Sequence, residues 1–182
     1  SVTNWTTSAD NANERFVTTL PMPSGQSNSE SNTANMVEER ERIREMLADL
    51  ETTLDGLREK QGISKRAYEA DRDRQDIVER RLERATQTCL DIARRLCLLE
   101  ERELGDATND ETLDELVEMG VLPASHRQEF VDIAGLRNVL AHRYRHIDDT
   151  EIYETYHDLE RLELFSESVY LYLREDVDDT AD

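Results

Sequence analysis

Apolar side chains recur at intervals of three and four residues from residue 36 to residue 174, and this spacing constrains the fold more than any other feature. On a helix of about 3.6 residues per turn, residues at those intervals share one face and form a stripe that must be buried. No segment alternates apolar and polar residues as a half-buried strand does. The sequence therefore predicts an all-α protein whose stripes meet in one core.

Breaks in the pattern predict four main helices and one short helix. Gly and Pro residues interrupt the stripes, and Ser or Asp residues at the following positions are typical helix N-caps. We expect an up-and-down bundle. The predicted helices span residues 36–61, 65–101, about 113–119, 125–141 and 150–174.

The two ends of the chain differ from this pattern. Residues 1–35 are rich in Ser, Thr and Asn and show no apolar periodicity, which predicts a flexible leader or a segment translated from a start site ahead of a natural start at Met36. Residues 175–182 form an acidic tail. We therefore expect one helical domain over residues 36–174.

The formal net charge of −20 limits what the chain can bind. Such a surface repels nucleic acid at long range. Dense carboxylates are also usual in proteins of organisms that live in high salt, where screening shortens the Debye length to about 3 Å. An RNA substrate is therefore compatible with this charge only if its site is locally basic.

Two cysteines and the absence of long apolar runs bear on the compartment. Cys89 and Cys97 are eight residues apart on a predicted helix, or about 12 Å, which is too far for a disulfide. They are interpreted as apolar core residues in a reducing compartment. No run approaches the roughly 20 apolar residues of a membrane span, and no signal-peptide pattern is present. We expect a cytoplasmic protein with no membrane association, no metal and no cofactor.

Cations gather in one part of this acidic chain. Residues 125–147 hold four arginines and three histidines against two carboxylates, whereas residues 148–182 hold two arginines against thirteen carboxylates. A phosphate could be held at such a basic island. Its cationic residues are Arg127, Arg137, Arg143, Arg145, His126, His142 and His146.

Arg137 and His142 are the residues of this island with the clearest chemical potential. Arg137 falls inside the apolar arc of its helix, where arginine is rare without a partner. It is either an ion-pair partner of a carboxylate on a neighbouring helix or a rigid guanidinium that grips a phosphate. His142 can transfer a proton near neutral pH. The two side chains lie about 140° apart on an unbroken helix, so they converge only if the helix ends near His142 or two copies of the chain meet.

The order Arg137, Asn138, His142 and Tyr144 stands within Leu-Arg-Asn-Val-Leu-Ala-His-Arg-Tyr-Arg-His-Ile-Asp. This segment, an Arg-x4-His-x-Tyr motif, resembles the HEPN superfamily, and specifically the HepT-like toxins encoded beside a minimal nucleotidyltransferase. The resemblance covers roughly Val37 to Arg174. It implies a HEPN-like helical bundle that forms a homodimer, with both motifs lining one cleft.

The resemblance also implies an activity and a partner. The activity is metal-independent cleavage of RNA, in which the ribose 2′-OH attacks the adjacent phosphate. His142 would be the general acid or base, Arg137 would stabilise the transition state, and Asn138 would position the phosphate, with Arg143 and Arg145 as further RNA contacts. Tyr144 matches the tyrosine that a cognate nucleotidyltransferase antitoxin modifies with AMP, which would block the cleft.

Three functions remain open at this point. The first is an endoribonuclease toxin neutralised by its nucleotidyltransferase. The second is a non-catalytic helical module that binds such a nucleotidyltransferase or a nucleotide. The third is a dimeric bundle with a structural role. The intact motif favours the first, because a binding module has no need to keep Arg137 and His142 together. Arg94 and Arg95, which few nearby carboxylates match, are expected to extend the cleft.

Overall fold

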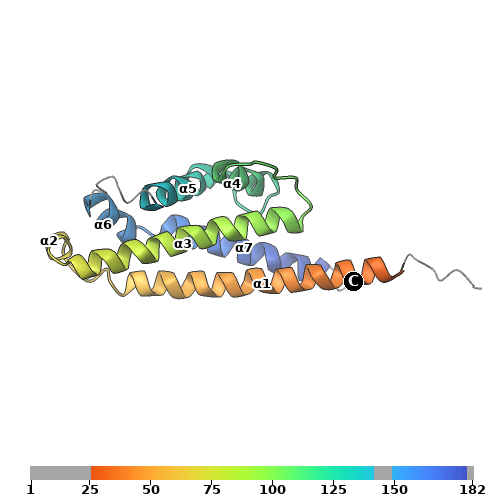
Figure 1. The fold of residues 1–182 in the computed structure, drawn as a ribbon, viewed down its shortest axis with the longest axis horizontal. Helices are drawn as coiled ribbons and strands as arrows, with labels where there is room; N and C mark the ends of the chain where they lie inside the picture. Colours follow the sequence, from red (N-terminus) through yellow and green to blue (C-terminus); the bar gives the residue numbers. More distant parts are fainter. Residues whose placement is uncertain (1–25, 142–148, 180–182) are drawn as a thin grey trace, which may run out of the picture.

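The computed structural model describes residues 26–141 and 149–179, and the side chains of residues 31–141 and 149–174. Within those ranges the regular elements are helices, with no strand, which confirms the predicted fold class (Figure 1). The helices are α1 (Gln26–Arg58), α2 (Lys65–Glu69), α3 (Arg72–Leu99), α4 (Asn109–Glu118), η1 (Ala124–His126, a 3₁₀ turn), α5 (Arg127–Ala141), α6 (Asp149–His157) and α7 (Glu160–Asp179).

Helix α3 is the centre of the bundle. It packs against α1 and α7 and also against α4 and α5, which lie along its other side in Figure 1. The side chains that it buries completely are apolar apart from one threonine: Val78, Leu82, Ala85, Thr86, Cys89, Ile92, Ala93, Leu96 and Cys97. One continuous core therefore runs the length of α3.

The predicted stripes form this core with one exception. On α1, α5, α6 and α7 the predicted positions are buried, and Met46 and Tyr153 pack partly against them. On α3 the apolar residue Ile77 is not part of the core: its side chain is 43% exposed, and the neighbouring Val78 is buried instead. Ile77 lies five residues before the buried Leu82, which places it off the buried face, whereas Val78 lies four residues before it.

The predicted helix over residues 65–101 is two helices, α2 and α3, which meet at Ala70 and Asp71. The Asp71 carboxylate caps α3 by accepting a hydrogen bond from the backbone N–H of Arg74 at 3.0 Å, and this bond lowers the pKa of Asp71. Gln75 Nε2 donates to the carbonyl oxygen of Tyr68 at 3.0 Å, which satisfies a group at the end of α2. Side-chain hydrogen bonds therefore stabilise the break between α2 and α3, and no Gly or Pro in the sequence indicates it.

The last predicted helix is also divided, between α6 and α7. Asp158 lies in the break, and its carboxylate accepts a hydrogen bond from the backbone N–H of Glu160 at 3.4 Å. The ring of His157 packs on Tyr153 and Tyr156, and its Nε2 lies 3.0 Å from the carbonyl oxygen of Gln61. His157 thus connects α6 to the segment that follows α1, and this role is structural.

Helix α1 starts ten residues before the predicted start at residue 36. The side chains of residues 31–38 are exposed, and this end of α1 projects past α3 in Figure 1. Residues 26–35 contain no Gly or Pro, so nothing in this stretch interrupts a helix that continues from the packed part of α1. The first part of the expected leader, residues 1–25, lies outside the described residues. At the other end, α7 continues to Asp179, into the expected acidic tail.

A glycine allows a close contact between α1 and α3 near the C-terminal end of α1. Arg81 Nη1 on α3 donates a hydrogen bond to the carbonyl oxygen of Gly56 on α1. A Cβ atom at position 56 would lie 2.5 Å from that Nη1, so a larger residue would displace the guanidinium. Glycine inside a helix is normally unfavourable by about 1 kcal/mol, and here it allows an arginine to contact the backbone of the neighbouring helix.

Among the described residues, no helix combines the length and the apolar character that a membrane crossing requires.

Two leucines of α3 allow a matched test of the core. Leu96 is 0% exposed and Leu98 is 60% exposed. Leu96→Ala should lower the free energy of unfolding by about 2–5 kcal/mol, because it leaves a cavity in the core. Leu98→Ala should change it by less than about 0.5 kcal/mol. Urea denaturation followed by circular dichroism measures both. An equal loss for the two variants would contradict the placement of α3.

The two buried cysteines should resist thiol reagents in the folded protein. Both thiols are free, and burial raises the pKa of Cys97 to about 11 and that of Cys89 further. Because the thiolate is the reactive form, labelling at pH 8 should be slow in buffer and complete in urea. The unfolded thiols, with a pKa near 8.5, ionise first as pH rises, so stability should fall above about pH 8.5. Rapid labelling without urea would contradict this burial.

Candidate active site

Arg137 lies on the side of α5 that faces α3. Its neighbours Leu136 and Leu140 are buried, and its own side chain is half-buried. Arg137 Nε donates a hydrogen bond to Oε1 of Gln87 on α3 at 3.0 Å. In the part of the chain that the structure describes, Arg137 forms no ion pair. The expected alternative, a carboxylate partner on a neighbouring helix, is therefore not seen there, and the contact is made by an uncharged amide.

Gln87 is held at its other end by Asp91. Gln87 Nε2 donates to Oδ1 of Asp91, one turn further along α3, at 2.8 Å. Arg137, Gln87 and Asp91 thus form a chain of hydrogen bonds from α5 to the exposed side of α3. The guanidinium uses its Nε–H in this chain, and its four Nη–H groups bond to no described residue. Those groups are the donors that bind a phosphate in two-pronged fashion.

The residues of the basic island that the structure describes differ in their partners. At its start, Arg127 forms an ion pair with Asp114 on α4 at 2.7 Å, which raises the pKa of the Arg127 guanidinium. His126 Nδ1 lies 3.3 Å from Glu129 Oε1. Carboxylates therefore partner both of these side chains. Arg137, in the same island, retains its charge beside a neutral amide.

The predicted site residues divide into two groups. Arg137 and Asn138 are described, and Asn138 lies on the exposed side of α5. The other four, His142, Arg143, Tyr144 and Arg145, fall in residues 142–148, which lie outside the described residues. Helix α5 is described to Ala141, so Arg137 is placed one turn before this segment, and α6 begins at Asp149 after it. The convergence of Arg137 and His142 remains a prediction.

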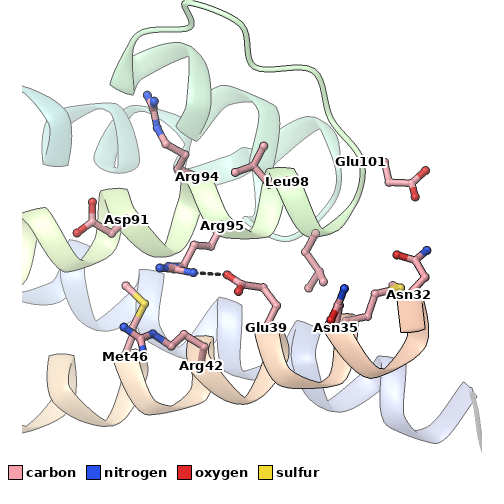
Figure 2. A pocket seen from close by; sticks show the side chains of 12 residues that line it. Asn32, Asn35, Glu39, Arg42, Met46, Asp91, Arg94, Arg95, Leu98 and Glu101 are labelled. Carbon is pink, nitrogen blue, oxygen red and sulfur yellow. Dashed lines mark hydrogen bonds and ion pairs between the residues drawn. The ribbon is translucent and has the colours of Figure 1, made fainter. Parts of the chain in front are cut away.

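Arg94 and Arg95 line a groove between α1 and α3, shown in Figure 2. The groove has a volume of about 900 Å³. Arg95 forms an ion pair with Glu39 on α1, and Arg94 Nη2 donates to the carbonyl oxygen of Ala107 at 3.2 Å. Asp91 also lines this groove, at one end of it in Figure 2. Because Asp91 bonds to Gln87, which contacts Arg137, the groove and the contact to Arg137 lie on the same face of α3.

Sequence reasoning missed Gln87. It lies fifty positions before Arg137, on a different helix. One signal in the sequence is its spacing of four from Asp91, which places the two side chains next to each other on a helix. That spacing indicates the Gln87–Asp91 bond and says nothing of Arg137.

Within the described ranges, no three His, Cys, Asp or Glu side chains lie close enough to hold a metal ion.

A family model identifies the class of protein. The model described as "Ribonuclease HepT-like" matches residues 36–169, which is most of the chain. This protein therefore belongs to the HepT-like ribonuclease family, and the resemblance seen in the motif is confirmed. No curated protein sequence matches the chain.

Solved structures share the fold. A toxin–antitoxin complex with AMP-PNP contains a chain 20% identical to this one, with a TM-score of 0.62, covering 71% of this chain and 97% of that one. YutE, a cytosolic protein of unknown function from Bacillus subtilis, is 19% identical with a TM-score of 0.64, covering 75% and 92%. A tri-AMPylated HEPN toxin of Shewanella oneidensis, in complex with an MNT antitoxin, is 21% identical with a TM-score of 0.62, covering 71% and 96%. At these identities the likeness concerns the fold alone.

Proposed function

We propose that this protein is a metal-independent endoribonuclease that acts as a homodimer and is the toxin of a toxin–antitoxin pair. The observation that carries the proposal is the state of Arg137. In a chain of net charge −20, this half-buried guanidinium is held by an amide that leaves its charge intact. It precedes His142 by five residues in a member of the HepT-like ribonuclease family.

The chemistry follows from these two side chains. One imidazole nitrogen of His142 takes the proton of the ribose 2′-OH, whose oxygen attacks the adjacent phosphorus, or gives a proton to the departing 5′ oxygen. The P–O5′ bond breaks, and the products are a 2′,3′-cyclic phosphate and a 5′-hydroxyl end. The Nη–H groups of Arg137 stabilise the charge that gathers on the phosphate oxygens. Asn138, Arg143 and Arg145 hold the neighbouring backbone.

A second copy of the chain would supply the geometry that this chemistry needs. Residues five positions apart on a continuous helix point about 140° away from each other. A two-fold axis beside the end of α5 would bring Arg137 of one copy toward His142 of the other, so that one phosphodiester meets both groups. The homodimer is therefore part of the proposed mechanism.

The proposed partner is a nucleotidyltransferase antitoxin that transfers AMP to Tyr144. Among the structures with this fold are a HEPN toxin that carries AMP groups in complex with its MNT antitoxin, and a toxin–antitoxin complex with AMP-PNP. AMP on Tyr144 would add bulk and negative charge two residues from His142 and would repel the RNA backbone.

The nuclease proposal predicts cleavage in the presence of EDTA. Purified protein in molar KCl should cut RNA and leave 2′,3′-cyclic phosphate ends, which mass spectrometry of the fragments detects. His142→Ala should lower the cleavage rate by about 10²–10⁴-fold through the loss of proton transfer. Arg137→Ala should lower it by about 10²–10³-fold through the loss of charge stabilisation.

Arg127→Ala is the matched control, because Arg127 belongs to the same basic island but is paired with Asp114. It should cut RNA at the rate of the unaltered protein. Cleavage that stops in EDTA, or that survives both Arg137→Ala and His142→Ala, would overturn the catalytic assignment. A protein that binds the antitoxin yet cuts no RNA would instead be the non-catalytic binding module.

The AMP proposal has its own test. A cognate nucleotidyltransferase, incubated with this protein and ATP, should raise its intact mass by whole AMP units and stop RNA cleavage. Tyr144→Phe should not gain the first AMP unit and should keep cutting RNA. Tyr170→Phe, at an exposed tyrosine of α7, should behave as the unaltered protein does. Equal mass gain in Tyr144→Phe would place the modification elsewhere.

A further inference from the structure

The contacts of Arg137 point to a further functional residue, and this inference rests on the nuclease function proposed above. We infer that Gln87, held by Asp91, is the positioning residue for the Arg137 guanidinium. Gln87 need not touch RNA. It would act by fixing the direction in which the Nη–H groups of Arg137 point.

The geometry restricts the guanidinium at one edge. The bond from Arg137 Nε to Gln87 Oε1 is 3.0 Å long and partly buried. A guanidinium is planar and rigid, so a bond that fixes its Nε–H also fixes the directions of its Nη–H groups, one of which lies on the same edge as the Nε–H. An arginine side chain otherwise samples many rotamers, and restricting them before the substrate binds removes an entropic penalty from the reaction.

The orientation of the Gln87 amide is fixed by its two partners. Arg137 can only donate, so the oxygen of the amide must face it, and a carboxylate can only accept, so the nitrogen must face Asp91. The bond from Gln87 Nε2 to Asp91 Oδ1, at 2.8 Å, therefore keeps Oε1 turned toward α5. If the amide turned over, it would present its N–H groups to the Arg137 cation.

The choice of an amide is consistent with a phosphate ligand. A carboxylate at position 87 would neutralise Arg137 and repel a phosphate. A neutral oxygen accepts the Nε–H and leaves the full positive charge for the substrate. Elsewhere on the same helix, Arg95 is paired with Glu39 and Arg84 with Asp49 at 3.9 Å, whereas Arg81 and Arg94 donate to backbone carbonyl oxygens.

The chain offers a matched control for this arrangement. On α5, Gln128 Nε2 donates to Oδ1 of Asp132 at 2.9 Å, with the same spacing of four residues. This pair is exposed, and no arginine of the described residues bonds to it. Substitutions at Gln128 therefore report the loss of a Gln–Asp pair on a helix without any effect on Arg137.

The experiment compares RNA cleavage by Gln87→Leu, Asp91→Asn, Asp91→Ala and Gln128→Leu in the full-length protein. Gln87→Leu should lower kcat by about 10- to 100-fold with KM within about threefold, because misplacing a guanidinium costs transition-state contacts. Asp91→Asn, which keeps an accepting oxygen, should cut like the unaltered protein. The kcat of Asp91→Ala, at an exposed position, should lie between the values of these two variants, and the kcat of Gln128→Leu should equal that of the unaltered protein.

A second measurement needs no cleavage. The Nε–H of Arg137 should exchange slowly with solvent in NMR spectra of the unaltered protein and of Gln128→Leu, and quickly in Gln87→Leu. The signal is assigned by its absence in Arg137→Lys. Melting curves of every variant show whether the fold is kept, and if Gln87→Leu does not fold, the Asp91→Ala and Asp91→Asn pair carries the comparison.

The outcomes separate the two proposals. If the unaltered protein cuts RNA and Gln87→Leu has the same kcat, the positioning role is wrong and the nuclease function stands. A rise in KM alone would also overturn the positioning role. If the unaltered protein cuts no RNA, the proposed function fails, and the NMR exchange rate alone then decides whether Gln87 fixes the guanidinium.

Discussion

Burial of one face of α3 is the constraint on which the other helices depend. The face packs against α1 and α7 and also against α4 and α5, and its apolar side chains are fully enclosed. Each such leucine contributes about 2–5 kcal/mol when measured by truncation, whereas isolated surface ion pairs contribute about 0–1 kcal/mol. The many ion pairs of this chain therefore cannot determine the fold. They cover the outside of a bundle whose arrangement the core has already set.

The same packing places the candidate site. Gln87 stands at the edge of the buried face of α3, half-buried, where α5 crosses it, so its amide can reach Arg137 without entering the core. Several cations elsewhere on the bundle meet carboxylates, such as Arg58 with Glu163 and Arg127 with Asp114. A chain with 42 acidic residues and 22 lysines and arginines can pair its cations readily. Arg137 differs from these pairs because its described partner is an uncharged amide, which leaves its positive charge without a neutralising neighbour.

Much of the fold could be predicted from the sequence because the buried face of a helix requires apolar residues at regular intervals. The stripes on α5, α6 and α7 were found without error, since intervals of three and four residues depend only on helix geometry. The breaks at Asp71 and Asp158 were missed, because an aspartate that caps a helix and one on a solvated face look alike until its hydrogen bonds are known. Arg137 and Asn138 could be singled out as neighbours in sequence. The contact between Gln87 and Arg137 could not, because it joins positions fifty residues apart and depends on how α3 and α5 cross.

The neutral amide beside Arg137 has a consequence for how the site responds to acidity. Glutamine has no proton to gain or lose between acid and alkaline solution, and arginine stays charged throughout that range. The direct contact between them therefore keeps its character where a bond between arginine and a carboxylate would weaken on acidification. In the proposed mechanism, His142 is then the group of the motif that titrates near neutrality, and a profile of rate against pH would record its ionisation with little change in the contact between Arg137 and Gln87.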